Sequence, residues 1–324
     1  MKAVVQDRYG SADVLELEDI ERPLVGDDHV LLRVRAAGLD PGVWHVMAGL
    51  PYLVRVMGFG LRRPRDRVRG TDVAGRVEAV GTNVNTFQPG DEVFGTCSGS
   101  FAEYACAHHE NLAPRPANLT LEQAAAVPVS ARTALHALRD RARVQHKQRV
   151  LVTGAGGGVG TFAVQLGRAF GAEVTAVCSA GKADHVRSAG AHHVIDYAQE
   201  DFTDGRRRYD VILDTAGRAP LSRLRRALTP RGTLVIVGGE GGGRWLGGFD
   251  RSILRAPLLS PFVGQRLLPV VPKQRRQDLI DLKDLIERGA VTPVIDRTYQ
   301  LSEVAEAVRY LRGGQVRGKV VIAV

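Results

Sequence analysis

A glycine-rich turn that directly follows an apolar run constrains this chain more than any other feature. Residues 150–153 are apolar and β-branched, which predicts a buried strand, and residues 161–170 follow with a helical pattern. Between them stands Ala155-x-Gly157-x-x-Gly160. Glycines let the backbone turn tightly into a helix whose first N–H groups face outward. The unit predicts a dinucleotide pyrophosphate held by Ala155, Gly157, Gly158, Val159 and Gly160.

The overall composition is that of a globular protein with room for two domains. The chain has 324 residues, of which 44% are hydrophobic, and it holds no apolar run long enough to span a membrane. The opening MKAVVQDRYG lacks the apolar core of a signal peptide, so a cytoplasmic protein is expected. Cys97, Cys106 and Cys178 have no metal-type spacing, which agrees with a reducing compartment.

The positive charge comes almost wholly from arginine. The formal net charge is +9, and arginines cluster at residues 62–69, 139–143, 206–208 and, with Lys273, at 275–276. These clusters are scattered and lack interleaved aromatic residues, so a solvated surface is favoured over a nucleic-acid groove. A basic surface would still attract a polyanionic cofactor.

The pattern of expected elements changes along the chain. Up to about residue 110 it is β-rich, with strands expected at residues 3–5, 15–17, 30–34, 73–80 and 92–94, and helices follow at 121–126 and 131–142. After the glycine turn, strands at 173–177, 193–195, 210–214, 233–237 and 267–271 alternate with helices at 182–188, 221–228 and 276–287. Short strands at 294–295 and 320–324 then flank a helix at 302–311. Repeated βα units with right-handed crossovers predict an α/β fold with a doubly wound parallel sheet of the Rossmann type.

Several motifs together resemble one known family, the medium-chain dehydrogenase/reductase superfamily, in its zinc-independent quinone oxidoreductase-like branch. They are VRAAGLDPGVW, GTDVAGRVEAVG, PGDEVFG, GSFAEYA, AAAVPVSARTAL, VTGAGGGVG, GAHHVIDY and GKVVIAV, and they follow the family's order. The resemblance implies a GroES-like β-rich catalytic domain at 1–123 and 290–324, and a Rossmann cofactor domain at 124–289. It also implies a homodimer paired through the edge strand around 267–271.

The positions that hold zinc in the family's metal-dependent members differ here. The places of the Cys-His pair and of the Gly-His-Glu motif read Leu39-Asp40-Pro41 and Gly70-Thr71-Asp72. Asp40 could ligate zinc, but the hydroxyl of Thr71 is a poor substitute for imidazole. We therefore predict no zinc, and without this Lewis acid the reduction of an activated acceptor is favoured over alcohol oxidation.

The residues at the end of the strand expected at 173–177 indicate which cofactor binds. NAD-binding folds place a carboxylate there for the ribose 2′-hydroxyl, whereas this chain has Cys178-Ser179 and then Lys182. A hydroxyl and an ammonium suit a 2′-phosphate, so NADPH is predicted. The resemblance adds Tyr197 near that phosphate, Thr133 facing the nicotinamide, and Gly238 and Gly239 near the carboxamide.

Hydride transfer also requires a donor for the oxygen that becomes anionic. The candidate catalytic residues are Tyr52, Asp40 and His45, and the arginine-rich insertion 53–69 is expected to shape the substrate entrance. The favoured function is NADPH-dependent reduction of a quinone or an α,β-unsaturated carbonyl. The alternatives are a metal-independent alcohol or aldehyde oxidoreductase and a non-catalytic NADPH-sensing or RNA-binding protein.

Overall fold

The computed structural model describes residues 1–238, 243–270 and 273–324. The chain forms two compact units, each with its own sheet. The first comprises Met1–Arg132, Lys273–Gly289 and Pro293–Val324, and the second comprises Thr133–Pro272 and Ala290–Thr292. Within the described ranges, no helix is long and apolar enough to cross a membrane.

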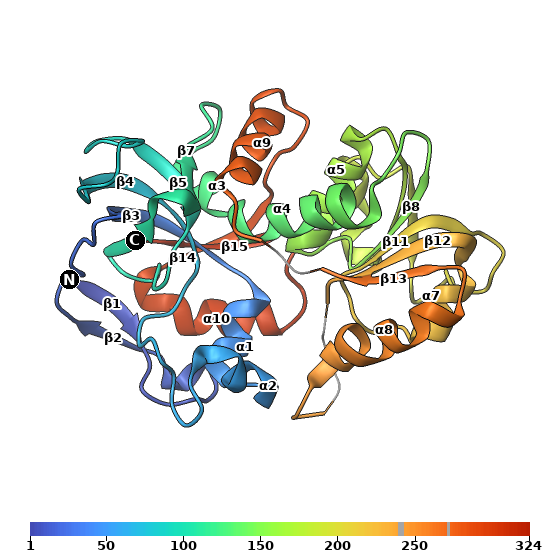
Figure 1. Ribbon diagram of the computed structural model, residues 1–324, viewed down its shortest axis with the longest axis horizontal. Helices are drawn as coiled ribbons and strands as arrows, with labels where there is room; N and C mark the ends of the chain where they lie inside the picture. Colours follow the sequence, from blue (N-terminus) through green and yellow to red (C-terminus); the bar gives the residue numbers. More distant parts are fainter. Residues whose placement is uncertain (239–242, 271–272) are drawn as a thin grey trace. The chain divides into compact units, whose positions relative to one another are not determined.

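The first unit is built on a seven-stranded sheet with a separate two-stranded ribbon (Figure 1). The sheet has the order β14-β15-β3-β4-β5-β7, and β6 also pairs with β3. The strands are β1 (Lys2–Val5), β2 (Glu16–Asp19), β3 (His29–Leu39), β4 (Asp72–Val80), β5 (Glu92–Thr96), β6 (Tyr104–His108), β7 (Leu112–Pro114), β14 (Ile295–Gln300) and β15 (Lys319–Ala323). The longest of them, β3, buries its apolar residues on both faces along most of its length and exposes Arg33 and Arg35.

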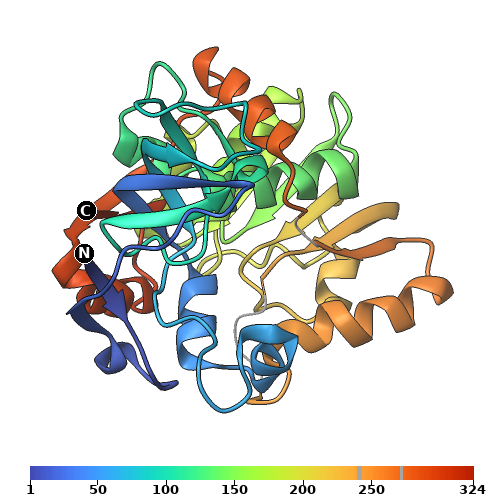
Figure 2. The ribbon, with the colours of Figure 1, turned by 60° about the vertical axis from the view of Figure 1, so that its left-hand side comes forward.

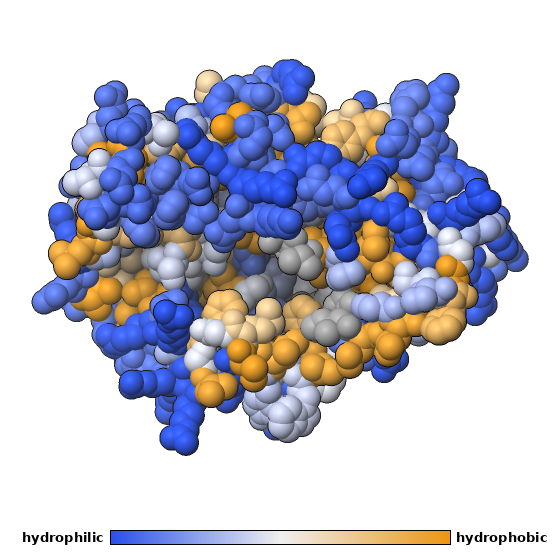
Figure 3. Space-filling model, in the orientation of Figure 1, coloured by the Kyte–Doolittle hydropathy of each residue, from blue (hydrophilic) through white to orange (hydrophobic). Residues whose placement is uncertain are grey.

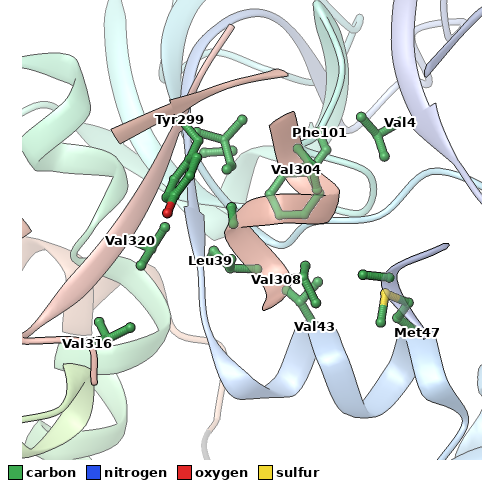
Figure 4. Packing of buried hydrophobic residues seen from close by; sticks show 14 residues of the cluster. Val4, Leu39, Val43, Met47, Phe101, Tyr299, Val304, Val308, Val316 and Val320 are labelled. Carbon is green, nitrogen blue, oxygen red and sulfur yellow. The ribbon is translucent and has the colours of Figure 1, made fainter. Parts of the chain in front are cut away.

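Helices α1 (Pro41–Ala48) and α10 (Val304–Arg312) share a core with this sheet. Figure 4 shows Val43 and Met47 of α1 and Val308 of α10 in the same cluster of buried side chains. The remaining helices are α2 (Tyr52–Val54), which continues into a π-helical turn at Arg55–Phe59, α3 (Leu121–Ala125), α4 (Pro128–Leu135), which runs into the second unit, and α9 (Arg276–Glu287).

The second unit contains a six-stranded sheet in which every pair is parallel. Its order is β10-β9-β8-β11-β12-β13, and these strands lie side by side in both views of the ribbon (Figures 1 and 2). The strands are β8 (Arg149–Thr153), β9 (Glu173–Cys178), β10 (His193–Asp196), β11 (Tyr209–Asp214), β12 (Leu228–Ile236) and β13 (Arg266–Pro269). The helices are α5 (Gly158–Ala169), α6 (Ala183–Ser188), α7 (Leu221–Arg226) and α8 (Ala256–Leu259), with π-helical turns at His136–Ala142 and Arg251–Arg255. The strand order reverses between β8 and β11, the position where such sheets bind ligands.

The predicted α/β class, with a β-rich module and a parallel sheet of the Rossmann type, is confirmed. Several boundaries differ. The helix expected at 221–228 ends at Arg226, because Leu228 already starts β12 and packs in the core of the second unit. The strand expected at 294–295 runs to Gln300, and the last residue expected in β13, Val271, lies outside the described residues.

The two compact units also divide the chain differently from the domain limits expected at residues 123 and 289. Helix α9 groups with the first unit, where Glu287 accepts a hydrogen bond from the backbone of Ala117 (2.8 Å) and the Asn118 amide donates to the carbonyl of Ile286 (2.9 Å). The domain limits expected from the sequence therefore stay a prediction.

A buried ion pair crosses the sheet of the first unit. Lys319 of β15 donates to Oδ2 of Asp72 of β4 at 3.1 Å, and both side chains are almost fully buried. Strand β3 lies between β15 and β4, and a Cβ on its Gly38 would lie 2.8 Å from the Asp72 side chain. Glycine at position 38 therefore provides the space in which Asp72 lies. The other Asp72 oxygen accepts from the backbone of Val129 (2.8 Å), which attaches the start of α4 to the sheet.

We expect Lys319→Met to lower the free energy of unfolding by about 3–5 kcal/mol, because it leaves the Asp72 carboxylate buried without its cation. The double variant Asp72→Asn/Lys319→Met should lose clearly less than the sum of the two single losses, since no lone charge stays buried. Urea unfolding of the three variants measures this. If the double variant loses as much stability as the two single variants together, the two charges are not coupled.

Candidate functional site

The glycine turn for which the sequence predicts a phosphate cradle lies where β8 leads into α5. Gly154 has φ +63°, in the left-handed region, and Gly157 N-caps the helix with no side chain over its first N–H groups. A Cβ on Gly160 would lie 2.2 Å from the carbonyl oxygen of Gly154, so the helix packs against the turn at a distance only glycine allows. The first helical turn carries no acidic residue, which leaves its positive end available to an anion.

Residues from the end of β9 lie beside this turn. A Cβ on Gly156 would lie 2.7 Å from Cδ of Lys182, so the Lys182 side chain packs directly over the glycine turn. Lys182 ends a short helical turn that begins after Ser179, and the carbonyl of Ser179 accepts the backbone N–H of Lys182 at 2.9 Å. Tyr197 follows the neighbouring β10, is 55% exposed, and donates its backbone N–H to the carbonyl of Cys178. The structure therefore brings the glycine turn, Ser179, Lys182 and Tyr197 to the carboxyl edge of the sheet.

The end of β9 is close to one negative and two positive side chains. Burial raises the pKa of the Cys178 thiol, and the nearby charge of Asp196 adds to this, whereas Lys182 and Arg187 act in the opposite direction. Lys182 and Arg187 are therefore two cations close enough to act on the end of this strand. Asp196 uses one carboxylate oxygen to accept from the backbone of Ala198 (3.1 Å).

A hydrogen-bonded network that the sequence analysis missed supports the turns after β8 and β11. Oδ1 of Asp214 accepts from the Thr153 hydroxyl (2.7 Å) and from the backbone of Gly217 (3.2 Å), and Oδ2 accepts from Arg251 (2.6 Å). The Thr215 hydroxyl donates to the carbonyl of Thr153 (2.6 Å). The signal in the sequence was a carboxylate at the end of the apolar run DVILD, since such a charge needs a partner when it is buried.

The remaining cofactor candidates lie at the same strand ends or on α4. The Gly238 N–H donates to the carbonyl of Asp214 (3.0 Å), and a Cβ at Gly238 would lie 2.1 Å from the carbonyl oxygen of Thr215. Glycine is therefore required there by close backbone approach. Thr133 lies on α4 and is 7% exposed, and Gly239 lies outside the described residues.

Asp40 N-caps α1 in the first unit. Its Oδ1 accepts from the backbone of Gly42 at 2.8 Å, whereas Oδ2 is buried with no hydrogen-bond partner among the described residues. Asp40 is also close enough to affect Asp72. Burial raises the pKa of Asp72 to about 6, Lys319 opposes this shift, and the negative charge of Asp40 adds to it.

The two other catalytic candidates follow Asp40 along the chain. His45 lies in α1, with Nδ1 2.9 Å from the carbonyl oxygen of Leu50 and its ring against that of Trp44. Tyr52 is the first residue of α2, and the guanidinium of Arg55 lies over its ring at 4.9 Å. The contact of His45 joins its ring to the carbonyl of Leu50 in the segment that follows α1, so Nδ1 has a structural role.

The place of the family's zinc ligands offers poor donors. In residues 1–238, 243–270 and 273–324, no group of three or more His, Cys, Asp or Glu side chains could hold a metal ion. The carbonyl of Thr71 accepts the N–H of Cys97 at 2.9 Å, and burial together with Asp72 raises the pKa of the Cys97 thiol. A thiol held in its neutral form is a weak metal ligand, because the thiolate is the form that binds.

Comparison with known proteins agrees with this arrangement. Residues 26–117 match the alcohol dehydrogenase GroES-like domain family, and residues 189–322 match the family described as zinc-binding dehydrogenase. The human protein named quinone oxidoreductase is 31% identical over 99% of this chain and 97% of its own length. The chain belongs to the medium-chain dehydrogenase/reductase superfamily, in its quinone oxidoreductase-like branch.

Other similar proteins have different names. A tomato (Solanum lycopersicum) protein named 2-methylene-furan-3-one reductase is 33% identical over 99% of this chain and 79% of its own length. The structure of the quinone oxidoreductase from Coxiella burnetii superposes with a TM-score of 0.86 at 27% identity, covering 100% of this chain and 99% of the other. The chain is therefore an oxidoreductase that uses a nicotinamide cofactor.

We expect Gly160→Ala to lower the free energy of unfolding by about 1–3 kcal/mol and to weaken cofactor binding, because the new methyl group forces α5 away from the turn. Gly181→Ala is the matched control, since a Cβ there meets nothing within 4 Å. Thermal unfolding and cofactor titration of both variants check this. Equal losses in the two variants would show that close packing at Gly160 is not required.

Proposed function

We propose that this chain is an NADPH-dependent, zinc-independent reductase that transfers hydride to a quinone or to an α,β-unsaturated carbonyl. The observation that carries the proposal is the Lys182 side chain packed over Gly156 of the glycine turn, with Ser179 rather than a carboxylate at the end of β9. NADPH, when bound, supplies the hydride. The residues of this chain supply binding, orientation and a proton.

The cofactor half of the proposal rests on charge and on backbone geometry. The uncapped first turn of α5 would hold the pyrophosphate with N–H groups of the Gly157–Gly160 turn. Lys182 would pair with the 2′-phosphate, and Ser179 and Tyr197 would donate hydroxyl hydrogen bonds to it. Asp214 and its hydrogen bonds would keep the turns after β8 and β11 in one arrangement, so that the nicotinamide end binds in a defined orientation.

The acceptor half of the proposal rests on the residues that replace a zinc site. The half-buried Cys97 thiol, whose pKa is raised, and the Thr71 hydroxyl provide no Lewis acid to stabilise an alkoxide, so an acceptor that is already electron-poor is the better substrate. Reduction of such an acceptor leaves an oxygen anion that needs a proton. Tyr52, Asp40 and His45 are the candidate donors, and Asp40 has a buried Oδ2 with no hydrogen-bond partner among the described residues.

We further propose that the protein is a homodimer formed through β13. This strand ends the order of the parallel sheet, and among the described residues it pairs with β12 alone. Antiparallel pairing of two such edges would join two sheets into one and satisfy the backbone groups on the outer side of β13.

We expect Lys182→Ala to weaken NADPH binding by about 10–100-fold, the effect of losing one charge-assisted contact, while NADH binding changes little. Lys182→Arg should retain most of the preference, and Lys283→Ala on α9 serves as the surface control. Fluorescence titration with each cofactor gives the two dissociation constants. If both cofactors lose affinity equally, the assignment of Lys182 to the 2′-phosphate is wrong.

The purified protein should oxidise NADPH with phenanthrenequinone, naphthoquinone or short enones, and a chelator such as EDTA should leave the rate unchanged. Absorbance of NADPH followed over time measures both. A protein that binds NADPH but reduces none of these acceptors would contradict the reductase proposal. Chelator-resistant activity with primary alcohols that exceeds the reductase rate would favour an alcohol oxidoreductase instead.

A further inference from the structure

The second unit has a polar hollow at the edge of its sheet opposite the glycine turn. The hollow has a volume of about 370 Å³, and its lining includes Arg143, Gln148, Asp210, Thr229, Arg231 and Arg266. These residues come from the loop before β8, the start of β11, the start of β12 and the first residue of β13. All of them lie in the part of the chain that forms the second unit.

The parallel register explains why residues so distant in sequence meet there. Val211 of β11 pairs with Val150 of β8 on one side and with Thr233 of β12 on the other. Thr233 in turn pairs with Arg266 of β13. These residues lie in one row across four strands, so the residues just before them form the amino-terminal edge of the sheet. The loops that lead into β12 and β13 form the right-hand rim of this unit in Figure 1, and hydrophilic residues cover much of that rim in Figure 3.

The hollow has an excess of positive charge. Arg143, Arg231 and Arg266 all have exposed side chains, and none forms a salt bridge with a described residue. Among the described residues, the Arg266 side chain donates to the carbonyl of Arg141, at 3.4 Å. Asp210 is the only acidic residue of the lining, and its Oδ2 already accepts from the backbone of Arg149 at 2.9 Å.

A second observation concerns Arg141, which lies next to the lining of the hollow but is not part of it. The Nε of Arg141 is buried and has no hydrogen-bond partner among the described residues. The carbonyl of Arg141 is the group that Arg266 contacts, so Arg141 adjoins the lining of the hollow. Buried guanidinium donors are normally satisfied, and an anion is the partner that suits them.

We propose that this arginine hollow, formed by Arg143, Arg231 and Arg266 with Gln148 and Thr229, binds a small polyphosphate anion. Three guanidinium groups around one space can each form paired hydrogen bonds to phosphate oxygens, and an amide and a hydroxyl add further donors. A single phosphate would leave part of this charge unmatched, whereas a chain of two or three phosphates would neutralise it. The phosphate chain of a nucleotide and an inorganic polyphosphate share this chemistry.

The hollow is distinct from the cofactor cradle because the two lie at opposite edges of one parallel sheet. Strand β8 has five residues between its start at Arg149 and its end at the glycine turn. At roughly 3.3 Å per residue the two edges are about 15 Å apart, so one short phosphate chain cannot occupy both. The inference does not depend on the proposed reaction.

Isothermal titration calorimetry with sodium tripolyphosphate tests the proposal, on the full chain saturated with NADPH. Binding should persist with NADPH present, and Arg231→Gln/Arg266→Gln should weaken it by about 100-fold, roughly tenfold per arginine. Arg33→Gln/Arg35→Gln is the matched control: it removes the same charge from exposed positions of β3 in the first unit and should bind as the parent does. A parallel titration with ATP identifies the source of the phosphates, since affinity at least tenfold above that of tripolyphosphate indicates a nucleotide and equal affinity indicates the free anion.

Three results would overturn the proposal. One is the absence of any binding heat at low ionic strength, where phosphate contacts are strongest. Another is an equal loss of affinity in the control pair, which would mean that the anion responds only to net charge. The third is loss of tripolyphosphate binding when NADPH is added, which would place the anion in the cofactor cradle. If the protein does not bind NADPH, the arginine variants and their control decide the question on their own.

Discussion

The parallel alignment of all six strands in the second unit is the constraint on which its chemistry depends. Parallel strands collect their carboxyl ends at one edge and their amino ends at the other. The carboxyl edge therefore holds the glycine turn, Lys182 and the Asp214 network, and the amino edge holds the arginine hollow. One sheet thus presents two cationic edges to anions, built from different residues of the same strands.

In the first unit, the comparable constraint is a buried charge. Asp72 reaches Lys319 across β3 because Gly38 has no side chain, and the same carboxylate also accepts from the start of α4. Burial raises the pKa of Asp72 to about 6, and Asp40 adds to this shift. The region around Asp40 and Asp72 therefore carries an internal ion pair and a nearby carboxylate.

Much of the geometry of the proposed cofactor site could be predicted from the sequence because that geometry is local. The glycine turn, the strand before it and the helix after it are adjacent in the chain, and Ser179 and Lys182 follow the next strand at the spacing of a βα unit. The Asp214–Arg251 contact was missed, because Arg251 stands in a π-helical turn without periodic pattern, 37 residues away. The arginine clusters were interpreted as dispersed surface charge, since nothing in their spacing indicates a common edge.

The sequence by itself determined the fold class, because backbone turns and hydrophobic periodicity act over a few residues. Its motifs also indicated the family, and its glycine turn indicated where a phosphate cradle is proposed. Only the tertiary structure decided which charges meet. Lys319 and Asp72 are 247 residues apart, and Arg143, Arg231 and Arg266 come from three separate segments. These contacts between charged side chains depend on strand order and register. Both arise when distant segments bury their apolar faces together, and no local pattern encodes them.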